Sequence, residues 1–241
     1  MTPRGPVRLF VIARHAESCA NVAGVVSSDP ARAVPLTARG RAQARRLGAQ
    51  LANLDIDLAV CTRFQRTRET LEVALAGRAV PVLVEPGFDE VRAGDFDGKP
   101  IEDYWSWREH HTENERLPHG ESEDDGLLRY GNAVRRLLSR SELVTLLVVH
   151  EFALHHIAAA ATSGPSPWSE QPFANALPFL FDERALERAA AALAKHRSCV
   201  RRAVRRPDTA FAEMTDPRNV RSTGRTDAVE LPRKKEHPCQ A

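Results

Sequence analysis

The sequence has few cysteine and few aromatic residues, and it has no long hydrophobic run. Its four cysteines include no Cys-x-x-Cys pair, so neither a zinc site nor a disulfide framework is indicated. The apolar run near the N-terminus ends at Arg14 after a few residues, which is too short for a signal-peptide core or a membrane span. We therefore expect a cytoplasmic protein with no membrane partner.

A strong excess of charge of one sign is also lacking. The formal net charge is +2 over 241 residues, which gives no reason to expect a nucleic-acid partner. The charge is uneven, because ten Lys and Arg residues oppose six Asp and Glu residues from Ser198 onward, where large apolar residues are scarce. Such a composition buries too little surface to order a chain. We expect one domain over residues 1–197 and a basic, flexible tail over residues 198–241.

Short apolar runs alternate with amphipathic segments along the first 197 residues. The runs 9–13, 57–61 and 144–149 predict buried parallel strands, and 175–181 predicts a last strand. The run 80–84 contains Pro81, which favours an edge strand. Helices are predicted over 38–53 (after the N-cap Thr37), 65–75 and 182–197. The loop that follows the first strand is predicted to run through Asn21 and residues 27–30. This alternation indicates an α/β fold with a mostly parallel central sheet.

Cationic and imidazole groups stand where three of these strands end. Arg14 and His15 close the first strand, Arg66 lies in the first turn after the second, and His150 closes the run 144–149. Ligands of open α/β sheets bind beyond the carboxyl ends of the strands, and helix N-termini favour anions. A guanidinium beside an imidazole favours its neutral, nucleophilic form. Taken alone, Arg14 and His15 also fit a strand-end pair that faces solvent or caps a helix.

The order of the motifs adds to this interpretation. Arg14-His15-Ala16-Glu17-Ser18 with Asn21 resembles the Arg-His-Gly-Glu-Ser…Asn signature of the histidine phosphatase (phosphoglycerate mutase-like) superfamily. Further stretches agree with that family in order and spacing, namely Leu36–Gly40, Cys61–Thr70, Asp89-Glu90 with Gly94 and Gly98, and Val148–His150. The resemblance covers roughly the first 180 residues and implies a three-layer αβα sandwich. It also implies a small helical cap insertion at about residues 99–130, which sets substrate choice.

The resemblance implies a role for each candidate residue. His15 would be the nucleophile, and Arg14, Arg66 and His150 would bind the phosphoryl oxygens. Glu90 would donate a proton to the leaving group, with Asp89 as the fallback. Asn21 either donates to a phosphoryl oxygen or forms an Asx-turn. The implied activity is a phosphomonoesterase that forms a phosphohistidine on a small phosphorylated substrate and needs no metal or other cofactor.

Two other functions stay open. One is a cofactor-dependent phosphoglycerate mutase, which needs a second anion-binding set; the cap offers no clear Arg-Arg pair for it. The other is a catalytically silent family member that binds phospho-ligands or a protein. Cys19 and Cys61 fall near the site but lack the phosphate-loop pattern of a catalytic cysteine. The sequence does not decide between a monomer and a dimer.

Several residues near the expected pocket have no clear role or depart from the family pattern. Trp105 and Trp107 either pack the cap or line its mouth. The pairs His110-His111 and His155-His156 lack the spacing of a metal site. Ala16 stands where the family usually has Gly. Glu151 replaces a small residue after His150, where a carboxylate facing the pocket would weaken anion binding and raise the pKa of His150.

Overall fold

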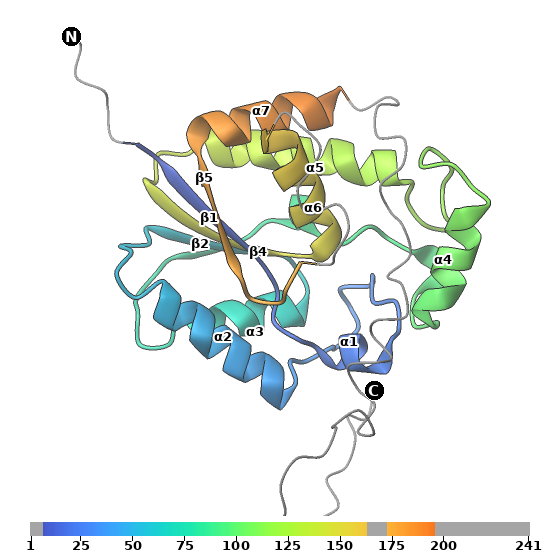
Figure 1. Cartoon of the computed structure of the whole chain (residues 1–241), viewed down its shortest axis with the longest axis horizontal. Coiled ribbons are helices and arrows are strands. Elements are labelled where there is room, and N and C mark those ends of the chain that lie inside the picture. Colours follow the sequence, from blue (N-terminus) through green and yellow to red (C-terminus); the bar gives the residue numbers. More distant parts are fainter. Residues whose placement is uncertain (1–6, 163–172, 196–241) are drawn as a thin grey trace, which may run out of the picture.

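The computed structural model describes residues 7–162 and 173–195. Its sheet has the strand order β3-β2-β4-β1-β5 (Figure 1). β4 (Val144–Val149) pairs in parallel with both β1 (Leu9–Arg14) and β2 (Leu58–Cys61). β3 (Val82–Val84) extends the parallel set at one edge, and β5 (Pro178–Asp182) pairs antiparallel with β1 at the other. The prediction of a mostly parallel sheet is confirmed.

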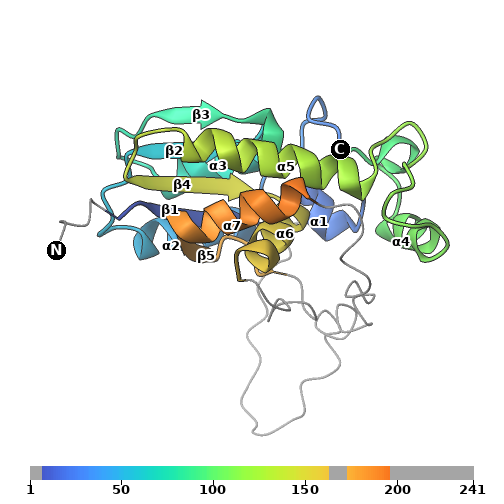
Figure 2. The same ribbon diagram turned by 90° about the horizontal axis from the view of Figure 1, so that it is seen from above.

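Helices cover both faces of the sheet, as Figure 2 shows from above. α2 (Ala38–Gln50) and α3 (Gln65–Ala74) lie on one face. The other face carries α5 (Glu123–Leu138), α6 (Glu151–Thr162) and α7 (Glu183–Ala194). The three-layer αβα sandwich is therefore confirmed.

The side chains of β1 show why such short apolar runs form this core. Phe10 and Ile12 belong to the apolar cluster on the α5–α7 side, whereas Val11 and Ala13 belong to the cluster on the α2–α3 side. Alternate residues of a strand point to opposite faces, so a strand buried on both faces must be apolar throughout. By contrast, Val82 and Val84 of the edge strand β3 remain exposed.

The ends of the elements differ from the sequence expectation by a few residues. The Thr37 side chain caps α2 by accepting a hydrogen bond from the Gly40 N–H at 2.9 Å, as expected, but the helix ends at Gln50 instead of residue 53. The last strand begins at Pro178 instead of Asn175. Ala176 has a φ of 55°, and its N–H donates to the Arg14 carbonyl at 2.9 Å, so a turn precedes the strand.

The prediction of a loop after β1 is wrong at one place. A short helix, α1 (Cys19–Ala23), interrupts it and ends at Gly24, whose φ is 64°. Ser18 and Asn21 form a reciprocal capping box, in which each side chain bonds to the other residue's backbone N–H. Local capping of this kind stabilises a single helical turn that has too few apolar residues to be seen in a periodic pattern.

The stretch expected to form the cap contains α4 (Ile101–Glu109), which lies to one side of the three layers (Figure 1). The short 3₁₀ helices η1 (Pro86–Phe88) and η2 (Gly94–Phe96) precede it. Trp107 is half-buried, stacks on His111 at a centroid distance of 3.7 Å and contacts Phe96. α5 begins at Glu123 and packs into the sandwich, so its first turns belong to the main layers.

The bounds of the domain and of its cap insertion stay predictions. The expected tail, residues 198–241, lies outside the described residues. Among the helices of residues 7–162 and 173–195, none has the length and apolar content needed to cross a membrane.

The packing of α2 on α3 generates a stability prediction at Gly48. A Gly→Ala change inside a helix ordinarily stabilises by roughly 0.5–1 kcal/mol. A Cβ at Gly48 would lie 2.2 Å from the backbone oxygen of Ala74, which cannot move away without shifting α3. We expect Gly48→Ala to lower the free energy of unfolding by roughly 1–3 kcal/mol in urea denaturation. Arg45→Ala, on the exposed face of the same helix, should stay within about 0.5 kcal/mol of wild type. A stabilised Gly48→Ala variant would contradict this packing.

Candidate active site

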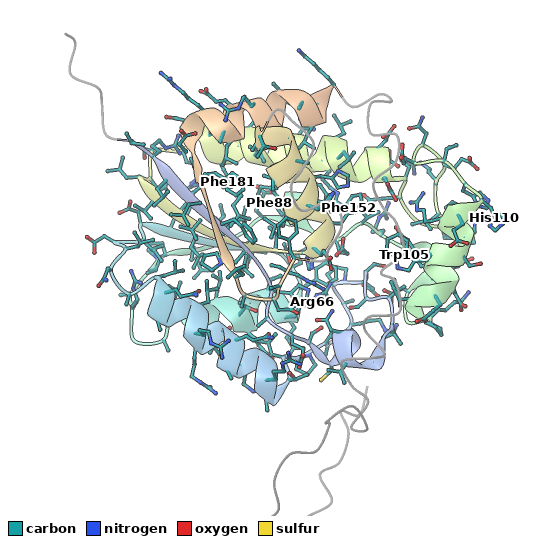
Figure 3. All side chains as sticks on the ribbon, in the orientation of Figure 1. Arg66, Phe88, Trp105, His110, Phe152 and Phe181 are labelled. Atoms are coloured by element: carbon teal, nitrogen blue, oxygen red, sulfur yellow. The ribbon has the colours of Figure 1, made fainter. Side chains whose placement is uncertain are left out.

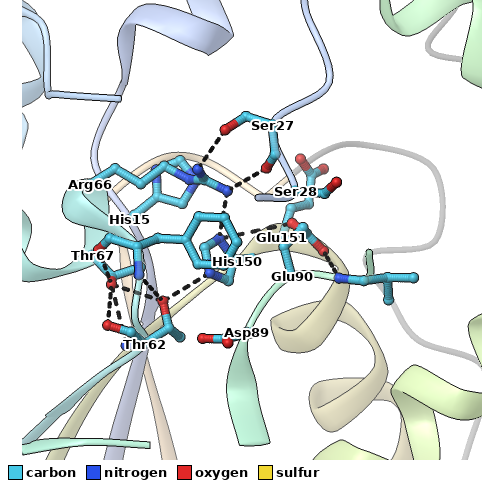
Figure 4. Close-up of polar contacts among 12 residues, drawn as sticks. His15, Ser27, Ser28, Thr62, Arg66, Thr67, Asp89, Glu90, His150 and Glu151 are labelled. Carbon is cyan, nitrogen blue, oxygen red and sulfur yellow. Dashed lines mark hydrogen bonds and ion pairs between the residues drawn. The ribbon is translucent and has the colours of Figure 1, made fainter. Parts of the chain in front are cut away.

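Three of the residues singled out in the sequence meet at the carboxyl edge of the sheet (Figure 4). His15 follows β1, Arg66 is in the first turn of α3, and His150 follows β4. Their exposed fractions are 4%, 4% and 0%. Parallel strands bring their carboxyl ends to one edge, which is why segments far apart in the sequence deliver these side chains together.

The Arg66 guanidinium joins the two imidazoles. Its Nε–H donates to His15 Nε2 at 3.1 Å, and one terminal nitrogen donates to His150 Nδ1 at 3.1 Å. Its other contacts are to the Ser27 hydroxyl and the Ser27 carbonyl, both at 2.9 Å. The Phe64 ring packs against the guanidinium at 4.4 Å from its centroid. Arg66 is therefore fixed in position by neutral partners, and no carboxylate of residues 7–162 and 173–195 forms an ion pair with it.

These contacts define the tautomer of His15. A guanidinium can only donate, so His15 Nε2 must be an acceptor and carry a lone pair. The opposite nitrogen, Nδ1, lies 2.8 Å from the carbonyl oxygen of Ala16 and must donate to it. The Asn175 side chain donates to the His15 carbonyl at 2.8 Å and fixes the backbone. The nitrogen with the lone pair thus faces the cationic pocket.

His150 has the opposite tautomer by the same reasoning. Its Nδ1 accepts from Arg66, so its Nε2–H donates to the Thr62 hydroxyl at 3.0 Å. Thr62 and Thr67 hydroxyls lie 2.9 Å apart, and Thr67 donates to the Phe64 carbonyl at 2.8 Å. The donors therefore run in one direction from the imidazole to a backbone oxygen. This chain holds the His150 ring with its Nδ1 toward the pocket.

Burial and charge keep both imidazoles neutral. Burial, followed by the charges of Arg66 and Arg14, lowers the pKa of His15 well below its ordinary value of 6.5. Burial and Arg66 likewise lower the pKa of His150. Burial lowers the pKa of Arg66 to about 10, so this group remains cationic at neutral pH. Any upward contribution of Glu151 to the pKa of His150 does not decide the net shift, because burial and Arg66 lower this pKa.

Glu90 completes the cluster. Its Oε2 lies 3.9 Å from His150 Nδ1, and its Oε1 accepts from the Val91 N–H at 3.1 Å. Burial raises the pKa of Glu90; Arg66 opposes this shift, and Glu151 adds to it. A carboxyl group that keeps its proton to higher pH is suited to act as an acid.

Asp89, the fallback for Glu90, is committed elsewhere. It accepts from the Arg63 backbone N–H at 3.0 Å and from Arg63 Nε at 2.6 Å. The same pair engages the Arg63 guanidinium. The geometry therefore favours Glu90 over Asp89.

The loop that carries Glu90 is held by residues that sequence reasoning missed. Arg129 of α5 donates to the carbonyls of Asp89 and Glu90 at 2.8 and 3.3 Å. The buried Tyr130 hydroxyl donates to the Asp89 carbonyl at 3.1 Å. Both residues lie about forty positions further along the chain, and no local pattern links them to the loop. Ser27, Thr62 and Asn175 were missed as contacts for the same reason.

Arg14 reaches the site from the end of β1. One of its terminal nitrogens donates to the Phe173 carbonyl at 2.8 Å and contacts a Glu151 carboxylate oxygen at 2.9 Å. Its Nε is buried without a hydrogen-bond partner among the described residues. The Ala16 side chain is fully buried in the apolar cluster on the α2–α3 side, and its φ is not positive. A methyl group is therefore accommodated at that position.

The remaining candidates have other environments. Asn21 is exposed, and its side-chain oxygen accepts from both the backbone N–H and the hydroxyl of Ser18, which is the capping-box contact and differs from the expected Asx-turn; a role in phosphate binding stays a prediction. Arg68, on the same helix as Arg66, is exposed. Burial raises the pKa of the Cys61 thiol to about 11, which disfavours a reactive thiolate. No group of three or more His, Cys, Asp or Glu residues suited to a metal ion occurs in the described part of the chain.

Fold and site together define an α/β protein with a buried cationic pocket in which a neutral imidazole nitrogen faces a guanidinium. A model of the histidine phosphatase superfamily (branch 1) matches residues 10–176, and the chain belongs to this family.

Curated relatives and solved structures agree with that family. The chain is 30% identical over 173 residues to the adenosylcobalamin/alpha-ribazole phosphatase of Salmonella typhimurium, which covers 66% of this chain and 82% of that protein. The protein of the same name from Escherichia coli is 36% identical over 91 residues, 38% of this chain and 43% of that protein. A probable phosphoglycerate mutase GpmB of Erwinia tasmaniensis is 29% identical over 151 residues, 59% of this chain and 69% of that protein. A crystal structure of a putative alpha-ribazole-5'-P phosphatase from Escherichia coli has a TM-score of 0.65 at 24% identity, covering 73% of this chain and 90% of that chain.

The two imidazoles generate a prediction that needs no activity assay. We expect ¹⁵N-detected histidine spectra to show His15 with its proton on Nδ1 and His150 with its proton on Nε2. Because burial and Arg66 lower both pKa values, both rings should remain neutral when the pH falls through 6.5. The exposed His110 and His119 provide reference signals in the same sample. Protonation of either ring near pH 6.5 would contradict the deduced hydrogen bonds.

Proposed function

We propose that the protein is a phosphomonoesterase that acts on a small phosphorylated metabolite through a phosphohistidine on His15. The observation that carries this proposal is the lone pair of His15 Nε2, held toward Arg66 by the Nδ1–H bond to the Ala16 carbonyl. An activated nucleophile beside an anion-binding group is the arrangement that covalent phosphoryl transfer needs.

In the first step, His15 Nε2 attacks phosphorus and the bond to the ester oxygen breaks. The entering phosphoryl group displaces the Arg66–His15 hydrogen bond, so the guanidinium can donate to the phosphoryl oxygens. The departing oxygen takes a proton from Glu90, whose raised pKa keeps that proton available. The products are the alcohol, phosphohistidine and the Glu90 carboxylate.

In the second step, water attacks the phosphohistidine. Glu90 removes a proton from the water, the N–P bond breaks, and inorganic phosphate and the neutral imidazole are released. The charge that spreads over the phosphoryl oxygens is stabilised by Arg66 and Arg14. His150 assists when its Nδ1 takes the proton that a phosphate monoanion brings, because the resulting N–H can then donate to a phosphoryl oxygen. These side chains supply the charge neutralisation, so the mechanism has no step that requires a metal or cofactor.

The relatives narrow the substrate to a class. Two carry the name adenosylcobalamin/alpha-ribazole phosphatase, which supports a phosphorylated small molecule as the substrate. The probable phosphoglycerate mutase keeps phosphoryl transfer between two positions of one molecule as an alternative. A silent, phospho-ligand-binding protein is the remaining alternative, and the assays below separate the three.

The first prediction concerns the nucleophile. We expect His15→Ala to lower turnover of a chromogenic phosphate ester by at least roughly a thousandfold, because no other described group in the pocket replaces the attacking nitrogen. Quenched wild-type reactions with ³²P-labelled substrate should contain an acid-labile, base-stable phosphoenzyme that the variant lacks. Arg68→Ala, an exposed change on the same helix as Arg66, should retain wild-type turnover.

Three outcomes would contradict the phosphatase proposal. A folded wild type without turnover on a broad phosphoester panel indicates the binding protein. Transfer of label between phosphoglycerate isomers at a rate above hydrolysis indicates the mutase. Full activity in His15→Ala places the chemistry on another residue.

The second prediction concerns pH. His15 is already neutral at pH 6.5 because its pKa is lowered, whereas Glu90 keeps its proton above its ordinary pKa of 4.5. The profile of kcat/KM should therefore reach its maximum on the acid side of neutrality and decline as the pH rises through the pKa of Glu90. In Glu90→Gln this alkaline decline should disappear.

Esters with different leaving groups provide a control for the role of Glu90 as proton donor. Loss of the acid should reduce hydrolysis of alkyl phosphates by roughly 10²–10⁴-fold. The p-nitrophenyl ester, whose leaving group needs little protonation, should be affected much less in its first step. Equal losses for both esters, with the alkaline limb unchanged, would show that Glu90 is not the proton donor.

A further inference from the structure

Glu151 lies beside the active-site residues, and the proposed mechanism gives it no role. It is the first residue of α6 and directly follows His150 at the pocket edge. Its Oε2 lies 2.9 Å from a terminal nitrogen of Arg14, whose side chain is 13% exposed while that of Glu151 is 37% exposed. One carboxylate therefore reaches a cation of the pocket from the solvent side.

The same carboxylate also acts on Glu90, since its charge adds to the upward shift in the pKa of that group. Figure 4 draws Glu151 together with Glu90, His150 and Arg66 as one cluster. Two carboxyl groups thus border a pocket whose cations are Arg14 and Arg66. A phosphate that bonds to Arg14 must therefore compete with Glu151 for that guanidinium.

The charges of the described residues indicate what this arrangement excludes. Arg14 and Arg66 attract a phosphate group, and the Glu151 carboxylate opposes that attraction at Arg14, which it contacts directly. A carboxylate or second phosphate near the transferred phosphate would be repelled by Glu151, although solvent weakens the repulsion because the Glu151 side chain is 37% exposed.

We propose that Glu151 is a specificity-determining residue, which restricts the pocket to phosphate monoesters whose alcohol portion carries no negative charge. This inference rests on the proposed phosphatase activity and deepens it. It goes beyond the proposed chemistry, in which Glu151 has no role. The substrate class that fits is a phosphate monoester whose alcohol portion is neutral or cationic.

The test uses two substrates that differ in one group. Glycerol 3-phosphate and 3-phosphoglycerate have the same three-carbon frame, and a hydroxymethyl group in the first is a carboxylate in the second. We expect wild type to prefer glycerol 3-phosphate, whose alcohol portion is uncharged, by about tenfold or more in kcat/KM. Glu151→Gln should reduce that preference by about tenfold, mainly through a lower KM for 3-phosphoglycerate. Each variant is measured at its own pH optimum, because Glu151 also acts on Glu90.

Matched variants separate specificity from general damage. Glu187→Gln, an exposed change on α7, should keep the wild-type preference. Glu151→Ala should behave as Glu151→Gln if charge is what matters, and either one suffices if the other fails to fold. An unchanged preference in a folded, active Glu151 variant overturns the inference and leaves the phosphatase proposal standing.

A binding measurement keeps the inference testable if wild type shows no turnover. Removing the carboxylate that competes for Arg14 should tighten the binding of inorganic phosphate by roughly three- to tenfold in isothermal titration calorimetry. In that case the phosphatase proposal fails, while Glu151 as an anion-repelling group is supported. Equal phosphate affinity in wild type and Glu151→Gln would overturn the inference.

Discussion

The site depends on the buried guanidinium of Arg66, which donates to both imidazoles and to Ser27. A side chain that can only donate imposes an acceptor on every partner, so one residue determines the tautomer of His15 and of His150. Its charge then lowers both pKa values in the same direction as burial does. The nucleophile and the second imidazole are prepared by the same contact, which arises because α3 begins where β2 ends.

The strand order places the two imidazoles next to each other, and α5 holds the loop that carries Glu90. β1 and β4 are neighbours, so His15 and His150 follow adjacent strands. Glu90 lies on a loop with little regular structure, and Arg129 and Tyr130 tie its backbone to the α5 layer. Figure 3 shows Arg66 at the end of the sheet, away from Phe181 and Phe88 in the core. The α5 layer thus positions Glu90, whose own loop has little regular structure to hold it.

The sequence predicted those elements and site residues that are marked by a local pattern along the chain. Apolar runs located β1, β2 and β4, Thr37 located the start of α2, and motif order located His15, Arg66 and His150. It did not predict α1, because the Ser18–Asn21 capping box resembles any polar turn. It missed Tyr130 and Asn175, because such contacts join positions from about forty to 160 residues apart through tertiary packing. The net lowering of the His150 pKa was not predicted for a related reason, since depth of burial cannot be deduced from a neighbour in sequence.

Arg66 and Arg14 differ in the groups that they contact before a substrate phosphate binds. Arg66 bonds to neutral acceptors, and a phosphate dianion replaces these with charge-assisted hydrogen bonds, which are the stronger kind. Arg14 already contacts a carboxylate, so a phosphate there exchanges one ion pair for another and gains less. Binding energy should therefore come mainly from Arg66. The Arg14–Glu151 pair instead makes the rim of the pocket sensitive to the charge of whatever group is attached to the phosphate.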